Sequence, residues 1–402
     1  MTGEDAQRDA VLIPTGYQPG SYPCLRSLGK RGVYTLVASE TEDAPEFKSR
    51  FCDERGVLPS PDDSQAYRDA LLGLAARPDV RTILPIREVD VYLLSKYRER
   101  FGKHVSLAVP PVAVLERVHD RKQLFDAAAD AGVPIPETQL LSDVDDWSPE
   151  LIIKSRYNLL CEDRIDGYRP GTVEEIKAVE HVRPGEKPDV AALRAQMKHD
   201  PIVQEFVPTS DEYMFAAIYD HGEPLATFQH RQIRGTSYTG GGSVYRESIY
   251  DEELESVGRT LLDHLDWHGL ACIEYMKDAR TGEFKLTEIN PRMWQSLPFT
   301  VRVGADFPYY YWLQATGDSD RIDIGPEPGY EVGTGSHLLY GEVGYLLSVL
   351  RDESPHVQRP SLVGAAMAVL ASCYKHPHFD YLRLDDPGPF VSGVGHMFSK
   401  LS

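Results

Sequence analysis

Between residues 10 and 86, short apolar runs alternate with helical patterns, and this alternation constrains the fold more than any other feature of the sequence. The apolar runs are AVLIP (10–14), VYTLVAS (33–39) and RTILPI (81–86). Two amphipathic segments, 24–32 and 66–80, lie between them. Buried strands that alternate with helices are typical of a parallel α/β sheet. The dinucleotide signature G-x-G-x-x-G is absent, so this sheet is not expected to bind a cofactor of that kind.

The alternation ends near HVSLAVPPV (104–112), where two prolines interrupt the pattern. Beyond it we expect a helix of about fifteen residues, a charged segment with the helical pattern TVEEIKAVEHV, and several strand-like runs. A helical and irregular stretch of roughly 80 residues ends the chain. The fold class is therefore α/β together with α+β. The expected division is 1–112 as an N-terminal α/β domain, 113–198 and 199–318 as two further units, and 319–402 as a C-terminal extension.

Charge composition argues against two classes of partner. The chain has 62 acidic and 42 basic residues, a formal net charge of −20. Such a surface repels nucleic acid and anionic membranes, so neither is expected to bind. An excess of carboxylates also suits a cytosol of high ionic strength, where the self-repulsion is screened. A halophilic source is our hypothesis for this charge.

The cysteines and the hydropathy pattern indicate a reduced, cytoplasmic protein. Five cysteines are scattered without C-x-x-C spacing, and their number is odd. The start of the sequence is acidic and does not have the pattern of a signal peptide. The longest apolar stretch, LVGAAMAVLASCY (362–374), is too short to span a bilayer.

The segments LACIEYMK (270–277) and FKLTEIN (284–290) read as two strands of a hairpin closed by a turn. If residue 278 faces residue 284, Glu274 lies opposite Glu288, and directly opposed residues share one face. Asn290 and Arg292 have the same parity as Glu288 and extend that face. An odd slip of the register would place Glu274 on the other face.

Two opposed carboxylates destabilise a bare sheet, and a hard divalent cation removes their repulsion. The oxygens of Glu274, Glu288 and Asn290 suit Mg²⁺, with Mn²⁺ as an alternative. A solvated hairpin face, on which these acids simply meet water, is the competing explanation.

Glu274 followed by EINPR resembles the metal-binding end of the ATP-grasp superfamily. The resemblance extends over roughly residues 1–318 through the segments DR…AGVPIP, IIK and VQEFV. Two further motifs, NPR-x-W-x-S and GGGS, are similar to motifs of the uncharacterised carboxylate–amine ligase branch of this superfamily. The resemblance implies an ATP-grasp architecture that follows a Rossmann-like pre-ATP-grasp domain.

The resemblance also assigns a role to individual positions. Lys154 and Arg121 would contact the phosphates of ATP, although Lys122 competes with Arg121 for this role. The main chain of the QEFV segment would recognise adenine, and Glu212 would bind the ribose hydroxyls. The expected nucleotide-binding residues are Arg121, Lys154, Glu205, Phe206, Val207 and Glu212. The loop after Lys154 is poorer in glycine than the family pattern, so it either folds differently or uses Arg156 and Arg164 for charge.

The implied reaction is an ADP-forming ligation in which a carboxylate becomes an acyl phosphate and is attacked by an amine. Arg292 would stabilise the transferring phosphate or the oxyanion that follows. Residues 229–248 carry a triple glycine and would form a loop that binds the substrate carboxylate, with Arg234 as its main contact. A long hairpin connection with solvated arginines is the alternative for this segment. Trp294 and Gln295 are expected near the same pocket, where Trp294 could equally serve packing.

Two other functions stay open at this point. A small-molecule kinase, or a ligase with a non-amine acceptor, would use the same nucleotide site. A catalytically inactive ATP-binding sensor is the second alternative, and the unusual loop after Lys154 is the feature that favours it. The expected partners are a small carboxylate and an amine, and a homodimer is left open.

Overall fold

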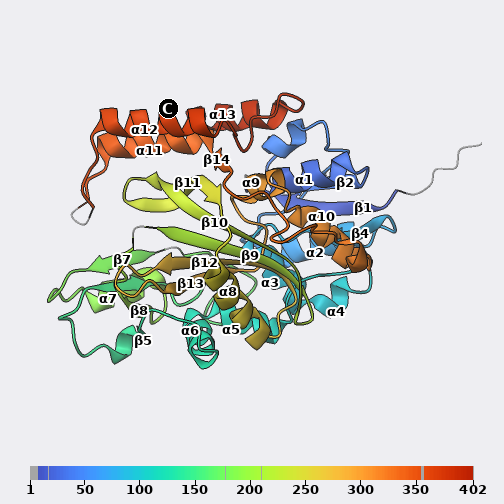
Figure 1. Cartoon of the computed structure of the whole chain (residues 1–402). Helices are drawn as coiled ribbons and strands as arrows, with labels where there is room; N and C mark the ends of the chain where they lie inside the picture. Colours follow the sequence, from blue (N-terminus) through green and yellow to red (C-terminus); the bar gives the residue numbers. More distant parts are fainter. Residues whose placement is uncertain (1–7, 17, 177, 210, 355–356, 402) are drawn as a thin grey trace, which may run out of the picture.

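The computed structural model describes residues 8–16, 18–176, 178–209, 211–354 and 357–401. Figure 1 shows three sheets and a layer of helices contributed by the end of the chain. The N-terminal sheet is parallel and has the order β3-β2-β1-β4. Its elements are β1 (Ala10–Thr15), α1 (Ser21–Lys30), β2 (Tyr34–Ser39), the 3-10 helix η1 (Pro45–Lys48), β3 (Glu54–Val57), α2 (Ser64–Ala75), β4 (Val80–Ile83), α3 (Glu88–Lys96) and α4 (Arg98–Phe101).

Both faces of this sheet are covered. Leu12 on β1 belongs to a core shared with α2 and α3, whereas its neighbours Val11 and Ile13 belong to a second core shared with α1 and the later helix α10 (Phe307–Thr316). A strand buried on both sides must be apolar at successive positions, which explains the unbroken run at residues 10–13. The predicted parallel α/β unit is confirmed.

A small antiparallel sheet follows, with the order β5-β8-β6-β7 and a separate apolar core of its own. Its elements are β5 (Thr138–Leu140), η2 (Leu141–Asp143), β6 (Leu151–Lys154), β7 (Val179–Val182), α7 (Val190–Met197) and β8 (Ile202–Glu205). One expectation is corrected here. A helix was expected over residues 172–182, but residues 172–176 and 178 lie outside helices and β7 follows them, because β7 pairs with the edge of β6; residue 177 lies outside the described residues. β8, which begins after residue 198, also belongs to this sheet.

The helix expected before Gly132 is divided in two. α5 (Val112–His119) and α6 (Arg121–Asp130) meet at Asp120, which has an extended backbone. The Asp120 carboxylate accepts a hydrogen bond from the backbone N–H of Lys122 and so caps α6. Arg121 is consequently the first residue of a helix.

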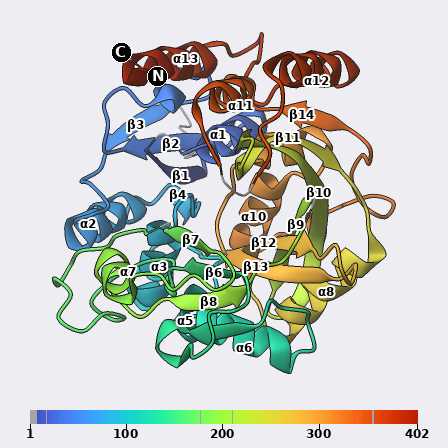
Figure 2. The same ribbon diagram turned by 90° about the vertical axis from the view of Figure 1, so that its left-hand side faces the viewer.

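The large sheet is antiparallel throughout, with the order β13-β12-β9-β10-β11-β14. Its strands are β9 (Glu212–Asp220), β10 (Glu223–Ser237), β11 (Gly240–Ser248), β12 (Gly269–Lys277), β13 (Phe284–Asn290) and β14 (Gly335–His337). The accompanying helices are α8 (Glu252–His264), α9 (Leu297–Arg302), α10 and the 3-10 helix η3 (Ser319–Arg321). Residues 229–248, expected as a loop, lie mostly within the paired strands β10 and β11. Figure 2 shows the small sheet beside β12 and β13.

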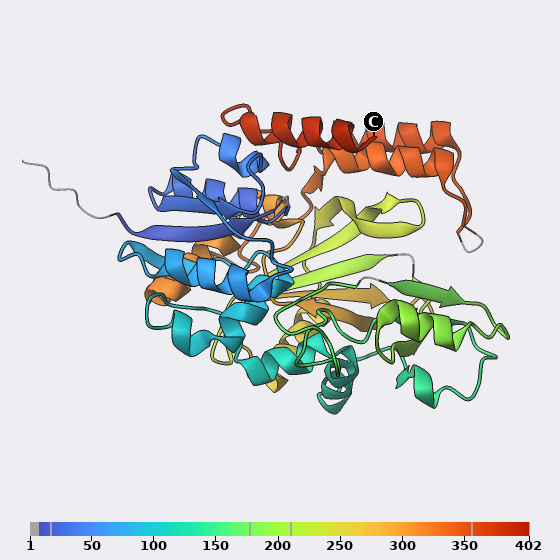
Figure 3. The ribbon, with the colours of Figure 1, turned by 180° about the vertical axis from the view of Figure 1, so that it is seen from behind.

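The C-terminal extension is joined to the rest of the chain at several points. It contributes β14 to the large sheet and the helices α11 (Leu339–Arg351), α12 (Leu362–Lys375) and α13 (Gly388–Leu401). Figure 3 shows these helices as a layer along one side of the molecule. Asp386 accepts hydrogen bonds from Tyr22 and Ser49 of the N-terminal unit. None of the described helices combines the length and the apolar character that crossing a membrane requires.

Candidate functional site

The hairpin of β12 and β13 carries two opposed carboxylates at the end away from its turn. Glu274 pairs with Glu288, and Cys272 pairs with Asn290. Opposed side chains of an antiparallel pair lie on the same face, so the two acids project together. The predicted pairing of Glu274 with Glu288 is confirmed.

The register reaches this pairing through a β-bulge. Near the turn, Phe284 faces Lys277 and not residue 278, which is one position away from the expected pairing. Between the pairs Tyr275–Leu286 and Glu274–Glu288 the register shifts, and Thr287 is the extra residue on β13. The bulge therefore returns Glu288 to the face of Glu274.

Glu288 lies within a hydrogen-bonded cluster. Nη2 of Arg121 donates to its Oε2 at 2.8 Å, and Nδ2 of Asn290 donates to its Oε1 at 2.8 Å. Burial alone would raise the pKa of Glu288, but Arg121 and Asn290 more than offset this effect and hold the pKa below its usual range. The carboxylate is therefore ionised at neutral pH.

Lys154 approaches the same face from the small sheet, where it ends β6. Burial, and then the positive charge of Arg121, lower the pKa of the Lys154 amine, while Glu288 and Glu274 act in the opposite direction. Arg121 also donates to the backbone oxygen of Ser155, at 2.9 Å, so its guanidinium bridges the two sheets.

Arg292 is oriented by a carboxylate that the sequence did not indicate. Its Nε lies 2.8 Å from Oε1 of Glu88, at the start of α3. Its Nη1 donates to the backbone oxygen of Met293 at 3.0 Å, and its Nη2 lies 3.5 Å from Oδ1 of Asn290. Burial acts to lower the pKa of Arg292, but the Glu88 carboxylate raises it overall, so the guanidinium stays charged.

Glu88 is in turn held by a buried histidine. Nη2 of Arg164 lies 2.9 Å from Nδ1 of His119, and Nε2 of His119 lies 3.1 Å from Oε2 of Glu88. Because an arginine can only donate, Nδ1 of His119 accepts and its Nε2–H donates to Glu88. Burial lowers the pKa of His119 and so agrees with a neutral ring. The chain from Arg164 to Arg292 is thus a continuous set of polar contacts.

Two adjoining cavities, of about 440 Å³ and 230 Å³, open on these residues. Both are lined by Lys154, Glu274, Thr287, Glu288, Asn290 and Arg292. Glu212 lines only the larger cavity, and Arg121 only the smaller one. The structure therefore brings most of the predicted charged site residues to one place, between the two antiparallel sheets.

Two residues of the triple glycine, Gly241 and Gly242, line the larger cavity. Its lining also includes Gln232, Ser243, Trp294 and Gln295. A Cβ on Gly242 would meet Oε1 of Gln295 at 2.7 Å, so a side chain there would displace the Gln295 amide. Nε2 of Gln232 donates to the Glu212 carboxylate at 2.6 Å, which links this part of the lining to the predicted ribose contact.

Arg234 lines neither of these two cavities, so the structure does not bring it together with the other predicted site residues. Its Nη1 donates to both carboxylate oxygens of Glu342 on α11, each at 2.7 Å. Arg234 leaves 9% of its side chain exposed and Glu342 leaves 2%. Contact with a substrate carboxylate would therefore require breaking a buried ion pair. Arg234 instead fastens β10 to the C-terminal helices.

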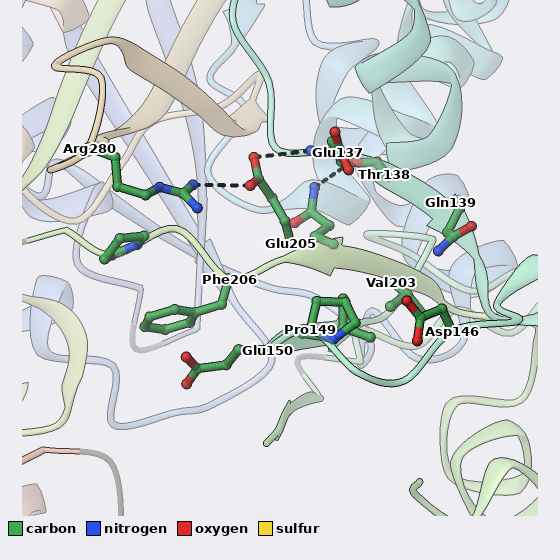
Figure 4. A pocket seen from close by; sticks show the side chains of 13 residues that line it. Glu137, Thr138, Gln139, Asp146, Pro149, Glu150, Val203, Glu205, Phe206 and Arg280 are labelled. Carbon is green, nitrogen blue, oxygen red and sulfur yellow. Dashed lines mark hydrogen bonds and ion pairs between the residues drawn. The ribbon is translucent and has the colours of Figure 1, made fainter. Parts of the chain in front are cut away.

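The predicted adenine segment lies at the edge of a third cavity, of about 630 Å³. Figure 4 shows the Glu205 carboxylate beside Arg280, which donates to it at 3.0 Å, and beside the backbone of Glu137. Glu205 and Phe206 line this cavity, whereas Val207 is buried outside its lining. The ring of Phe206 stacks on His181, with centroids 4.9 Å apart.

The glycine-poor loop after Lys154 folds over the smaller cavity, which Ser155 and Asn158 line. The two arginines considered there as phosphate ligands already have protein partners. Arg156 makes two hydrogen bonds to the Asp120 carboxylate, and Arg164 contacts His119 and the backbone oxygen of Leu159. Arg156 and Arg164 are therefore both paired within the protein in this structure.

Glu88, which contacts the predicted site residue Arg292, was not identified from the sequence. It follows β4 closely, and polar residues beyond the carboxyl ends of parallel strands commonly line ligand sites. Its position after a parallel strand could therefore have identified Glu88 as a candidate site residue. Nothing in the sequence connects it with Arg292 or His119, since both contacts join distant segments.

The oxygen donors at the hairpin match the chemistry of a hard divalent cation. Glu274 and Glu288 supply carboxylate oxygens on one face, and Asn290 has a carbonyl oxygen beside them. Mg²⁺ is normally held by one or two carboxylates and completes its shell with water and phosphate oxygens. The residues present therefore fit such an ion.

Comparisons with known proteins agree with this architecture. No family model matches the sequence. Among curated proteins, the chain is similar to the D-aspartate ligase of Enterococcus faecium (strain Aus0004), with 20% identity over 331 residues, 76% of each chain.

Three solved structures share the fold. An ADP complex of an N5-carboxyaminoimidazole ribonucleotide synthetase has a TM-score of 0.59 at 17% identity, over 92% of this chain and 97% of that one. The L-amino acid ligase of Bacillus licheniformis has a TM-score of 0.55 at 12% identity, over 79% and 77%. A Rhizobium etli pyruvate carboxylase has a TM-score of 0.60 at 15% identity, over 82% of this chain but only 30% of that protein.

At these levels of identity the likeness establishes the fold. The fold is that of the ATP-grasp proteins, as the resemblance in the sequence implied. The Rossmann-like N-terminal unit precedes the two antiparallel sheets, and the candidate site lies between those sheets.

Proposed function

We propose that the protein is an ATP- and Mg²⁺-dependent ligase that joins a carboxylate to an amine and forms ADP. One observation carries the proposal: Arg121, Lys154, Glu288, Asn290 and Arg292 meet around two joined cavities between the sheets. Cations and paired oxygen donors in one cavity suit a polyphosphate with its metal ion. The names of the similar proteins, a D-aspartate ligase and an L-amino acid ligase, support the choice of a carboxylate–amine ligation.

Each residue has a defined task in this proposal. Lys154 and Arg121 bind phosphate oxygens, and Glu212 binds the ribose. The main chain of Glu205, Phe206 and Val207 faces the adenine. A magnesium ion held by Glu274, Glu288 and Asn290 would neutralise charge on the β and γ phosphates.

The reaction needs positioning and charge stabilisation more than a strong base. A substrate carboxylate oxygen attacks the γ phosphorus, the bond to the ADP oxygen breaks, and an acyl phosphate forms. The amine nitrogen then attacks the acyl carbon, phosphate leaves, and the nitrogen gives up a proton. Arg292 stabilises the negative charge that develops, and Glu88 holds its guanidinium in place.

A release assay tests this function. The full chain is incubated with ATP, Mg²⁺ and pairs of carboxylates and amines at high salt, and ADP and products are measured. ADP release that requires both substrates, with a new amide bond in the product, is the expected result. A phosphorylated or non-amide product would indicate the kinase or the ligase with another acceptor, and ATP binding without ADP release would indicate a sensor.

We also propose that the protein works in a cytoplasm of high ionic strength, because its net charge of −20 is best tolerated where it is screened. The unfolding midpoint should rise when KCl increases from about 0.1 M to about 2 M. A midpoint indifferent to salt over this range would refute the halophilic assignment.

We further propose a homodimer formed through α12. Its residues Val363, Met367, Leu370 and Tyr374 are spaced along one helical face, and each leaves most of its side chain exposed. The helix contains no acidic residue, so a second copy could approach it without adding to the repulsion of a strongly acidic molecule. Light scattering should give the dimer mass for the native chain and the monomer mass for Leu370→Glu. A native chain that is monomeric at micromolar concentration would overturn the proposal.

A further inference from the structure

A cavity of about 280 Å³ lies away from the nucleotide site, between α1, α9 and the segment that precedes α13. Helices α1 and α9 lie side by side at this position (Figure 1). Five basic residues line the cavity: Arg26, Lys30, Arg31, Arg302 and Arg383. None of its lining residues lines the two cavities that contain Lys154.

The acidic residues near this cavity do not neutralise it. Asp306 is paired with Arg31 at 2.9 Å, and Asp380 is paired with the fully buried Arg246 on the large sheet. Asp385 is 2.6 Å from Arg26. Within the described part of the chain, neither Arg302 nor Arg383 forms a salt bridge, so positive charge remains in excess.

Hydrogen bonding in the cluster is incomplete as well. Nε of Arg302, Nε of Arg383 and Nη1 of Arg26 are buried and have no hydrogen-bond partner among the described residues. Buried donors without partners are rare in folded proteins. Arg26 and Arg302 have other acceptors, Asp385 and the backbone oxygen of Phe379, but part of the donor capacity of the cluster is unused, and guanidinium groups suit anions such as phosphate.

The electrostatics support the same view. Burial, and then the neighbouring charges of Arg383 and Arg26, lower the pKa of Arg302 to about 10. Burial and Arg26 also lower the pKa of Arg383. An anion in the cavity would relieve this repulsion.

We propose that this cavity binds a phosphate group, at a site separate from the nucleotide site. The four guanidinium groups that line the cavity present many N–H donors, and a phosphate offers four oxygens and about two negative charges to accept them. The group could belong to free inorganic phosphate or to a small phosphomonoester. The volume of about 280 Å³ has room for either one.

Binding of inorganic phosphate to the full chain tests the site, by calorimetry at constant ionic strength. The double variant Arg302→Gln/Arg383→Gln should weaken binding at least tenfold. Arg351→Gln, an exposed position on α11, is the matched control and should bind as the native chain does. Lys154→Ala should also bind normally, which separates this site from the proposed nucleotide site.

Several outcomes would overturn the proposal. These are equal binding by the double variant, loss of binding in Lys154→Ala, or tighter binding of malonate than of phosphate. A parallel titration with glycerol phosphate distinguishes a site for a phosphomonoester from a site for free inorganic phosphate. Only the first kind of site should bind glycerol phosphate more tightly than inorganic phosphate. If the double variant does not fold, the single variant Arg383→Gln replaces it. Its unfolding midpoint is then measured with and without phosphate. A rise in the midpoint as large as that of the native chain would contradict the assignment.

Discussion

Thr287 and Glu288 are neighbours in a β-strand, yet both line the same two cavities. In a regular strand, successive side chains point to opposite faces. The bulge between the pairs Tyr275–Leu286 and Glu274–Glu288 removes that restriction. One extra residue therefore adds a hydroxyl to the cavity wall without displacing either carboxylate from it.

Glu288→Gln should abolish most of the proposed ATP turnover while leaving the fold intact. The amide can still accept a hydrogen bond from Arg121, but it lacks the charge that would hold Mg²⁺. ADP release should fall by at least about 100-fold. Glu283→Gln, an exposed change in the turn of the same hairpin, should leave the rate unchanged. Native-like activity of Glu288→Gln would refute the metal assignment.

Acid should destabilise the native chain partly through Glu288. The pKa of this carboxyl is lower in the folded protein than the ordinary value of about 4.3, so the unfolded chain binds the proton more readily. The stabilisation is present above the ordinary value and is lost as pH falls through the folded pKa. In urea unfolding between about pH 5 and pH 3, the native chain should lose more stability than Glu288→Gln. Parallel curves would contradict the assignment.

Glu88→Gln should lower kcat more than it changes the KM for ATP. Glu88 touches Arg292 and His119 and lines only the smaller cavity, so its effect is expected through the position of Arg292. Loss of such a positioning contact typically costs about 10- to 100-fold in activity. Glu116→Gln, an exposed change on α5, is the control. A raised KM with an unchanged kcat would show that Glu88 acts on binding instead.

Arg234→Met should destabilise the protein without altering the KM for the carboxylate substrate. It leaves the buried Glu342 without its arginine, at a cost of about 3–5 kcal/mol. The double variant Arg234→Met/Glu342→Leu should recover part of that loss, since both charges are removed. Chemical unfolding measures the stability of all three. A stable Arg234→Met with a strongly raised KM would restore the substrate role first expected for Arg234.

The parts of the fold that follow from local sequence patterns were predicted better than the parts that depend on long-range contacts. The buried strands and the hairpin follow from apolar periodicity and turn residues, which act over a few positions. Residues 172–182 also have a helical pattern, but pairing with β6 decides their structure. The pairing of Glu274 with Glu288 was predicted from a register at the turn that differs by one residue from the observed one. The bulge at Thr287 compensates for this difference.

The part of the candidate site that could be predicted is the part in which a motif places several site residues close together in the sequence. EINPR supplies Glu288, Asn290 and Arg292 within five residues. Arg234 could not be assigned in this way, because its partner Glu342 lies 108 positions further along the chain. Glu88 was missed for the same reason, since folding alone brings it to Arg292.

The hydrogen bonds from Tyr22 and Ser49 to Asp386 join the N-terminal unit to a residue that lies 364 and 337 positions further along the chain. During synthesis, the strands of the N-terminal unit leave the ribosome long before Asp386 does. That unit can fold early, but its surface is completed only after Asp386 has been synthesised. A chain that terminated before Asp386 would expose an incomplete surface at its beginning, where quality-control proteases could recognise it.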